Sequence, residues 1–318
     1  MISICIPVYK AQSYLKDTLY CLSRQTYKEL ELILVNDGDG LDYTAIIESF
    51  PQLPIQYIIQ KNAGAGAARN TAFKYSRGKY IKFLDADDLL SPDCIEQQLK
   101  LAEANPGKIV SGKWGRFYNN DITTFRLSPE SVWKNCDGKT WIIESWSQGP
   151  NMTQPGIFLI PRDLINKQGL WQEELSQGPC DDMEFYTRLI LYSEGIAFCP
   201  QAILYYRSGQ ANSLSGLKST VSFEWYLETV KRSVGYLLEK YPADKASRQA
   251  AAIQYQIVGY KAYPYNRAVS REALNEAKKL GGSGYSYPAG GMTQFLNNIF
   301  GWRNIIRLKQ LIGYPKIN

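Results

Sequence analysis

The sequence predicts an α/β protein built on a mainly parallel sheet with helices on both faces. Short apolar segments with the length of buried strands alternate with segments whose apolar residues recur at helical spacing. The strand-like segments are 2–9, 31–35, 55–60, 79–84 and 109–118, and the helical segments between them are 12–24, 43–50, 64–76 and 92–104. Because strands and helices alternate in this way, most strands should run parallel, and ligands should bind beyond their carboxyl ends.

Local signals justify each element of this first half. The first strand is a short apolar run, and the helix after it repeats Leu15, Leu19 and Leu22 at helical spacing. The third helix begins with glycines, and the fourth has Pro92 at an early position, where proline is tolerated. Polar or glycine-rich residues follow the strands, so they should gather at one edge of the sheet.

The second half of the chain is less regular and becomes helical towards its end. Its expected elements are a strand at 156–160, a helix at 181–191, a strand at 196–207, helical stripes at 223–237 and 250–262, a glycine-rich linker at 281–291 and a basic amphipathic helix at about 293–312. We therefore expect an α/β domain over 1–217, divided near 118, and a helical C-terminal region over 218–318.

Composition indicates an ordinary globular protein with a mild preference for anionic partners. Of the 318 residues, 45% are hydrophobic and 21% are charged, and the formal net charge is +6. The positive charge suits nucleotide phosphates or an acidic membrane surface, and nucleic acid is not expected because no dense run of Lys or Arg is present. The six cysteines form no CxxC pair, the chain begins with a strand pattern, and no apolar stretch reaches about 20 residues. These features predict a cytoplasmic protein without a membrane span.

The chain contains no histidine, which restricts the chemistry it can perform. Proton transfer near neutral pH must then use Asp, Glu, Lys, Tyr or Cys. A bound metal would take oxygen ligands, because the cysteines are widely spaced and carboxylates favour a hard cation.

Three carboxylates directly follow the strand at 79–84. Asp85, Asp87 and Asp88 lie within four positions, and like charges this close repel unless a cation lies among them. A divalent cation there would also neutralise a departing diphosphate. The alternative is an Asp-rich turn that precedes the helix at 92–104.

Three further segments carry candidate residues, each with a structural alternative. Asp37 follows the second strand and could accept a hydrogen bond from a nucleobase, or could be a turn residue. The small residues of 62–70 could let a ligand approach, with Arg69 facing phosphate or base, or could begin a tightly packed helix. Asp181 and Asp182 could provide a general base, or could stabilise the N-terminus of the helix at 181–191.

Taken together, these motifs resemble the family 2 glycosyltransferases, which are inverting enzymes with the GT-A fold. The resemblance covers about residues 1–215 and is carried by five motifs in this order: Pro7-Val8-Tyr9, Val35-Asn36-Asp37-Gly38, Ala68-Arg69-Asn70, Asp85-Ala86-Asp87-Asp88 and Cys180-Asp181-Asp182-Met183-Glu184-Phe185. Its implication is a nucleotide-sugar-binding part at 1–118 and an acceptor part with the catalytic base at 119–217.

The resemblance implies a role for each matching residue. Pro7, Tyr9 and Asp37 would hold the nucleobase, and Arg69 would contact base or phosphate. Asp85, Asp87 and Asp88 match the DxD motif, with Mn²⁺ or Mg²⁺ as the cofactor and Asp87 towards ribose and metal. Asp182 stands at the position of the catalytic base.

The chain also departs from the family pattern. Asn36 and Asp181 replace a usual aspartate and a usual glutamate, and Asp39 replaces a usual serine. The segment 206–215 resembles a loop that often carries a histidine in the family. Without that histidine, Arg207, Gln210 or Ser213 would contact the diphosphate, or Asp181 and this loop would contact the acceptor.

The expected activity is therefore transfer of a sugar from a nucleotide diphosphate donor, expected to be a UDP-sugar, to a hydroxyl group. The acceptor would be a glycan or a lipid-linked sugar in bacterial cell-surface polysaccharide or glycolipid synthesis. Two alternatives are an inactive glycan-binding scaffold protein and a sugar nucleotidyltransferase, although the latter needs a glycine-rich basic loop where 9–12 has none.

The segment at 293–312 suggests where the protein acts. Phe295, Ile299, Trp302 and Ile306 fall on one stripe, and Arg303, Arg307 and Lys309 add positive charge. This helix could pack on the catalytic domain or on another subunit, or could lie in the membrane interface at the inner face of the cell membrane.

Overall fold

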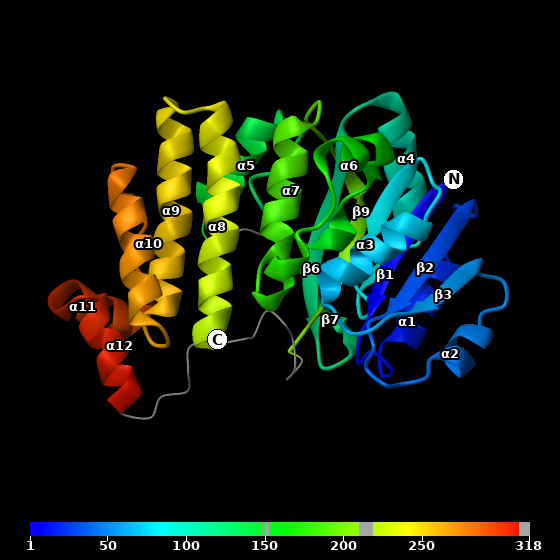
Figure 1. Cartoon of the computed structure of the whole chain (residues 1–318), viewed down its shortest axis with the longest axis horizontal. Coiled ribbons are helices and arrows are strands. Elements are labelled where there is room, and N and C mark those ends of the chain that lie inside the picture. The colour runs from blue at the N-terminus through cyan, green and yellow to red at the C-terminus, as the bar shows by residue number, and fades with distance from the viewer. Residues whose placement is uncertain (148, 150–152, 210–218, 312–318) are drawn as a thin grey trace. The chain divides into compact units, whose positions relative to one another are not determined.

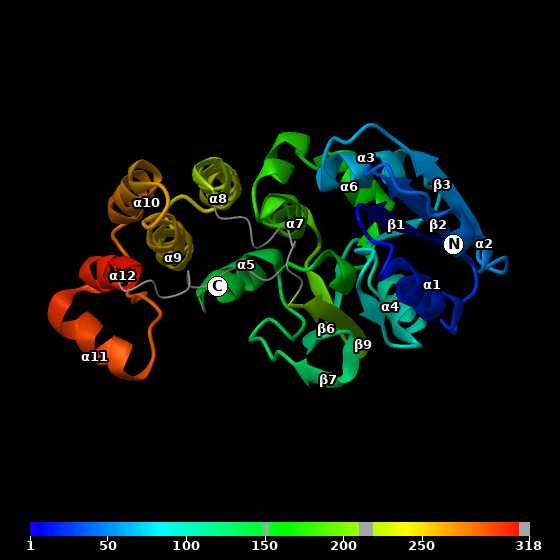
Figure 2. The same cartoon turned by 90° about the horizontal axis from the view of Figure 1, so that it is seen from below.

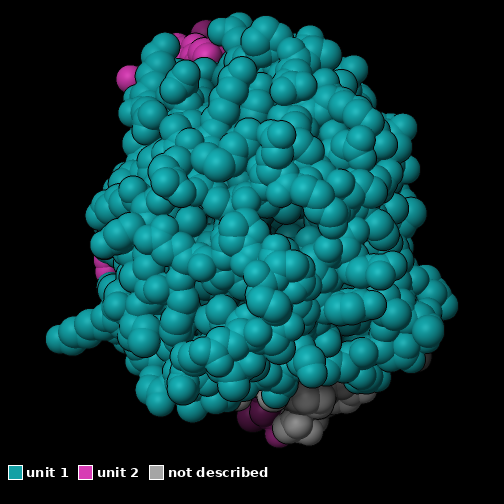
Figure 3. Space-filling view, turned by 90° about the vertical axis from the view of Figure 1, so that its right-hand side faces the viewer, with its two compact units in different colours: residues 1–145, 152–177, 181–211 teal, residues 146–151, 178–180, 212–318 magenta. Residues whose placement is uncertain are grey.

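A computed structural model describes residues 1–147, 149, 153–209 and 219–311 (Figure 1). The chain forms two compact units. The first comprises 1–145, 152–177 and 181–211, and the second comprises 146–151, 178–180 and 212–318. Figure 3 shows a face on which residues of the first unit form nearly all of the visible surface.

The first unit is built on a five-stranded sheet with the order β3-β2-β1-β4-β8. Its strands are β1 (Ile2–Val8), β2 (Leu30–Asn36), β3 (Ile55–Ile59), β4 (Tyr80–Phe83) and β8 (Ile160–Pro161). All neighbours pair in parallel except β8, which is antiparallel to β4. Strand β2, which lies between β3 and β1, is buried along its whole length, as expected for a parallel strand covered on both faces.

The first four helices of the chain match the sequence expectation, and the first three of them connect strands of this sheet. They are α1 (Leu15–Ser23), α2 (Thr44–Glu48), α3 (Ala65–Tyr75) and α4 (Cys94–Ala104) (Figure 2). The α/β architecture predicted from the alternating pattern is thereby confirmed.

A second sheet in the same unit has the order β5-β9-β6-β7. Its strands are β5 (Leu89–Leu90), β6 (Ile109–Tyr118), β7 (Asp121–Leu127) and β9 (Ile196–Ser208). Strands β6 and β7 form a hairpin whose turn residues, Asn119 and Asn120, both have positive φ angles. Asparagine tolerates this conformation, so an Asn-Asn turn between two strands was a hairpin signal that the sequence interpretation missed.

The segment between the hairpin and α7 (Asp181–Tyr192) is more helical than expected. It contains α5 (Gly138–Ser147), a 3₁₀ turn (Pro155–Ile157), β8, α6 (Arg162–Gln168) and a second 3₁₀ turn (Glu173–Gln177). The prediction of a strand at 156–160 was wrong for most of its length. A Cβ on Gly156 would lie only 2.6 Å from Leu204 Cδ1, so close packing against β9 determines this segment.

The second unit is helical: α8 (Thr220–Lys240), α9 (Lys245–Ala262), α10 (Arg267–Lys279), α11 (Gly291–Phe300) and α12 (Trp302–Leu311). Side chains cap the first three of these helices, since Ser219, Asp244 and Asn266 each accept a hydrogen bond from a first-turn backbone N–H. Among the helices of the described ranges, none combines the length and hydropathy needed to cross a bilayer.

The single helix expected at about 293–312 is instead two helices. Gly301, with a φ of 74°, separates α11 from α12. The break also divides the predicted apolar stripe. Trp302 and Ile306 pack with Tyr260, Tyr263 and Tyr287, whereas Phe295 and Ile299 are exposed.

Candidate functional site

The parallel register brings the predicted residues together at one edge of the main sheet. Val8 pairs with Asn36 at the ends of β1 and β2, and Cys5 pairs with Phe83 at the end of β4. The residues that follow these strands are Tyr9, Asp37 and Asp85. Pro7 is partly buried within β1, whereas Tyr9 is 48% exposed.

Asp37 organises the loop that leads into α3. Its Oδ1 accepts hydrogen bonds from Ala63 N at 2.9 Å and Gln60 Nε2 at 2.7 Å, and its Oδ2 accepts one from Gly64 N at 2.8 Å. A carboxylate has about four acceptor positions, so one remains for a ligand. The turn role that the sequence left as an alternative is therefore present, whatever Asp37 does for a nucleobase.

Arg69 connects two of the predicted motifs. Its Nη2 lies 2.8 Å from Asp85 Oδ1, its Nη1 lies 3.4 Å from Asp181 Oδ2, and its guanidinium lies 4.4 Å from the centroid of the Trp171 ring. The side chain is buried, and its two neighbouring carboxylates offset the cost of burying the charge. Arg69 thus fixes the end of β4 relative to the start of α7, a role different from the predicted contact with base or phosphate.

The small residues of 62–70 serve close packing of the protein itself. A Cβ on Gly66 would lie 2.5 Å from Ser176 Oγ, and a Cβ on Gly64 would lie 3.0 Å from Ser176 Cβ. Ser176 Oγ accepts a hydrogen bond from Gly66 N and donates one to Asp181 Oδ2. The alternative of a tightly packed helix start therefore describes this segment, and ligand approach is not needed to explain it.

The turn after β4 does not form the predicted site with three carboxylate ligands. Asp88 is buried, its Oδ1 accepts a hydrogen bond from Arg207 N at 3.0 Å, and its Oδ2 has no hydrogen-bond partner among the described residues. Burial, together with the charges of Asp87 and Asp85, raises the pKa of Asp88. In the described ranges, no three His, Cys, Asp or Glu side chains are grouped so that they could hold a metal ion. Asp85 is paired with Arg69, and Asp88 accepts a hydrogen bond from the backbone of Arg207, so both carboxylates already have partners within the protein.

Asp182 begins α7 together with Asp181 and has the environment of a proton acceptor. Its Oδ2 accepts a hydrogen bond from Thr153 Oγ1 at 2.8 Å, and its Oδ1 accepts one from Met183 N at 3.0 Å. Burial and the nearby charge of Asp181 raise the pKa of Asp182 to about 7. A carboxyl with this pKa can accept and release a proton near neutral pH.

Arg207 has a structural role that differs from the predicted contact with diphosphate. Its side chain is only 2% exposed. The guanidinium donates to the carbonyl oxygen of Asp87 at 2.7 Å, to Asp17 Oδ2 at 3.2 Å and to Asn120 Oδ1. These bonds fasten the turn after β4 to α1 and to the β6–β7 hairpin. The other two candidates from this loop, Gln210 and Ser213, lie outside the described residues.

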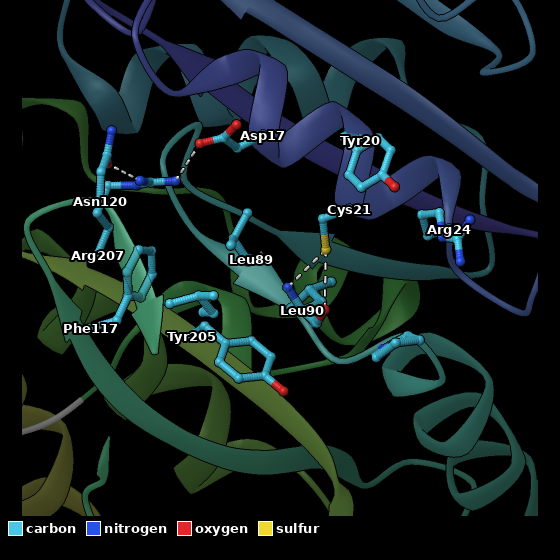
Figure 4. A pocket seen from close by; sticks show the side chains of 12 residues that line it. Asp17, Tyr20, Cys21, Arg24, Leu89, Leu90, Phe117, Asn120, Tyr205 and Arg207 are labelled. Atoms are coloured by element: carbon cyan, nitrogen blue, oxygen red, sulfur yellow. Dashed lines mark hydrogen bonds and ion pairs between the residues drawn. The ribbon is translucent and has the colours of Figure 1, made fainter. Parts of the chain in front are cut away.

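A pocket lies on the Arg207 side of the smaller sheet (Figure 4). It has a volume of about 420 Å³ and is lined mainly by α1, β5, β9 and the hairpin, including Tyr20, Cys21, Leu89 and Tyr205. Of the predicted site residues, only Arg207 contributes to it. The sequence interpretation did not anticipate this pocket, because it depends on the pairing of β5 with β9.

The opposite face of the same strands carries a cluster that the sequence interpretation also missed. In the parallel pairing of β6 with β9, Arg116 is opposite Tyr206 and Phe117 is opposite Arg207. Alternation along the strands therefore puts Arg116 and Tyr206 on the face opposite Arg207. Burial and the charges of Asp88, Asp85 and Asp87 raise the pKa of Tyr206.

The family model that matches this chain and the related proteins agree with one another. The family model for glycosyl transferase family 2 matches residues 3–167. The glycosyltransferase GlyA of Streptococcus pneumoniae is 26% identical over 252 residues, which is 76% of this chain and 36% of GlyA. The uncharacterized glycosyltransferase RP339 of Rickettsia prowazekii is 37% identical over 55% of this chain and 54% of its own length. The matches thus span between about a third and a half of these relatives.

A solved structure has the same fold. S. aureus TarS residues 1–349, crystallised in complex with UDP-GlcNAc, superimposes with a TM-score of 0.67 over 100% of this chain and 93% of that one. The two sequences are 16% identical, so this similarity supports the shared GT-A fold.

Proposed function

The chain belongs to glycosyl transferase family 2, and from this premise we propose that it transfers a sugar from a UDP-activated donor to a hydroxyl group, with inversion at the anomeric carbon. One observation carries the mechanistic part of the proposal: Asp182, the residue expected as the base, has a pKa raised to about 7 by burial and by Asp181. A carboxyl group with its ordinary pKa would be a much weaker proton acceptor.

The chemistry needs one such carboxylate. The acceptor oxygen forms a bond to the anomeric carbon while its proton passes to Asp182. The bond between the anomeric carbon and the diphosphate oxygen breaks, and UDP leaves with the electron pair. Because attack and departure occur on opposite faces of the sugar, this single displacement inverts the anomeric configuration.

The donor end of the site is the edge of the main sheet. The exposed residue Tyr9, directly after β1, offers a ring on which a nucleobase could stack, and Pro7 and Asp37 lie at the ends of β1 and β2. The complexes of TarS with UDP-GlcNAc and with UDP support uridine as the base to test first. A polysaccharide or glycolipid acceptor remains part of the proposal.

The residues after β4 fit a hard divalent cation shared with the substrate. Mg²⁺ is usually held by one or two carboxylates together with substrate phosphates, so a cage of three protein carboxylates is not required. Asp85 and Asp87 supply oxygen ligands of the right chemistry, and Asp88 Oδ2, which has no hydrogen-bond partner among the described residues, is a further oxygen beside them. When bound, Mn²⁺ or Mg²⁺ would neutralise charge on the departing diphosphate.

The first prediction is the pH dependence of donor cleavage. Below pH 7 the Asp182 carboxyl is protonated and cannot accept a proton, so kcat/KM for UDP release from UDP-N-acetylglucosamine should fall about tenfold per pH unit. It should level off above pH 7. GDP- and dTDP-sugars, assayed in parallel, should be cleaved more slowly. Failure to cleave any of these donors would favour an inactive glycan-binding protein.

A substitution beside Asp182 sharpens this test. The Thr153 hydroxyl stabilises the charged carboxylate of Asp182, so Thr153→Val should raise the pKa of Asp182. The fall in kcat/KM should then begin at a higher pH. The exposed pair Thr140–Asp137 has a comparable hydroxyl–carboxylate bond away from the site, and Thr140→Val should leave the profile unchanged. If the fall in kcat/KM at low pH is identical in the two variants and the wild type, a group other than Asp182 causes that fall.

We also propose that the C-terminal helices bind an anionic membrane surface. Exposed apolar side chains are Phe295 and Ile299, which are 63% and 58% exposed, together with Phe300, Leu308 and Leu311. Arg303 and Arg307 are exposed on α12, and no Asp or Glu occurs after Glu276. Apolar side chains with positive charge around them suit an interfacial helix, and each basic residue contributes about 1 kcal/mol near anionic lipid.

The second prediction is therefore binding to vesicles at low salt. The protein should co-sediment with vesicles of phosphatidylglycerol and phosphatidylcholine, and less with pure phosphatidylcholine. Phe295→Ser combined with Ile299→Ser should reduce binding. Val221 on α8 is similarly exposed, at 54%, and Val221→Ser serves as the matched control. If the double variant binds as the wild type does, these helices are not the membrane contact.

A further inference from the structure

Arg116 stands out as a cation without an acidic partner. Its guanidinium carbon lies 5.2 Å from the centroid of the Trp114 ring and 5.0 Å from that of the Tyr206 ring. Its Nη1 donates to Ser208 Oγ at 2.8 Å. Within the described ranges no carboxylate lies within ion-pair distance of it, and the segments outside those ranges contain no Asp or Glu.

This arrangement distinguishes Arg116 from the other arginines near the site. Arg69 is held by Asp85 and Asp181, and Arg207 donates to Asp17, so the charges of both are already matched within the protein. Arg116 is fixed by two aromatic rings and one hydroxyl, which leaves most of its five N–H donors free of protein carboxylates. A guanidinium oriented in this way has little entropy to lose on binding an anion.

The position of Arg116 connects it to the proposed reaction. It is paired across the sheet with Tyr206 and donates to Ser208, so it lies beside the end of β9 that carries Arg207. Tyr206 directly precedes Arg207, whose backbone N–H binds Asp88. A phosphate group held near that turn would therefore lie close to Arg116.

We propose that Arg116 binds a phosphate group of a substrate in this site. The planar guanidinium can donate two parallel hydrogen bonds to phosphate oxygens, and its stacking on Trp114 and Tyr206 holds that plane. The inference rests on the proposed function, because that function brings a phosphorylated substrate to the turn. The phosphate can come from the diphosphate of the donor or from a phosphorylated acceptor.

The third prediction tests this site by calorimetry on the full chain with Mn²⁺ present. If the donor supplies the phosphate, Arg116→Gln should weaken UDP binding about tenfold to a hundredfold and leave uridine, which lacks phosphate, unaffected. If the acceptor supplies it, UDP affinity should stay constant. Binding of glycerol 3-phosphate to the UDP-saturated protein should then weaken by a similar factor.

Matched variants separate recognition from folding. Arg116→Lys keeps the charge without the planar fork, so it should fall between the wild type and Arg116→Gln. Arg77 has a side chain that is 80% exposed and precedes β4, at the end of that strand opposite the turn, so Arg77→Gln should remove the same charge without affecting either ligand. If Arg116→Gln unfolds at the wild-type temperature and binds UDP and glycerol 3-phosphate as the wild type does, the phosphate site is refuted. A wild type that binds no UDP contradicts the proposed donor instead.

Discussion

Replacing Asp182 with asparagine should lower kcat by about two to four orders of magnitude, the range that general acid–base catalysis contributes. The substitution preserves the size of the side chain and can keep the hydrogen bond from Thr153, but it removes the proton acceptor. Affinity for UDP, measured by calorimetry, should stay within about twofold, because Asp182 acts on the acceptor rather than on the nucleotide. Turnover is followed as release of UDP in the presence of Mn²⁺.

Two controls define what the Asp182 result means. Asp163, exposed in the first turn of α6, lies outside the site, and Asp163→Asn should leave turnover unchanged. Asp181→Asn should cost less than Asp182→Asn, because Asp181 contacts Arg69 and Ser176 rather than the expected position of the acceptor. If Asp182→Asn retains a rate within a few-fold of the wild type and the product keeps its configuration, another group is the base.

The main sheet and its acidic edge could be predicted because their signals are local. Each of β1, β2 and β4 is a mainly apolar run with polar residues at or soon after its end, so Asp37 and Asp85 could be assigned to strand ends from the chain alone. The register of a parallel sheet then brings those ends together. The chemistry of the donor end thus follows from short stretches of sequence.

The remaining features depend on contacts between distant segments. Arg207 and Arg116 are similar residues at strand positions, yet one is matched by Asp17 and the other is not. That difference depends on segments far apart in the sequence, since Asp17 lies on α1 and Arg116 pairs with Tyr206 across the smaller sheet. The same holds for Gly66, whose role depends on Ser176. Packing of this kind has no local sequence signal, so the partners of Arg207 and Arg116 could not be predicted from the sequence.

The raised pKa of Asp182 depends both on the local sequence and on contacts between distant segments. Its position at the start of a helix could be predicted, but the proton affinity depends on burial, on Thr153 from another segment and on Asp181. Arg69 links this residue pair to the turn after β4, since it contacts both Asp181 and Asp85. Binding of a diphosphate near Asp85 would therefore change the contacts of Asp181 at the start of α7, because the buried guanidinium of Arg69 joins the two residues.

Asp87→Asn should abolish detectable transfer, and treatment with EDTA should do the same to the wild type. A divalent cation contributes several kcal/mol to stabilising the charge of a departing diphosphate, and about 1.4 kcal/mol corresponds to a tenfold change in rate, so losing it should cost at least about a hundredfold. Adding Mn²⁺ or Mg²⁺ should restore the EDTA-treated wild type but not the variant. Asp121→Asn, at an exposed position at the start of β7, controls for loss of a carboxylate.

The affinity for the cation should itself depend on nucleotide. With one or two protein carboxylates available, Mn²⁺ should bind weakly to the free protein and more tightly once UDP supplies phosphate oxygens. By linkage, Mn²⁺ should strengthen UDP binding by the same factor, which calorimetry in both orders of addition can measure. Asp87→Asn should remove most of that coupling. If EDTA-treated protein keeps full activity, or if the affinity for UDP does not change when Mn²⁺ is added, the turn after β4 acts without a metal.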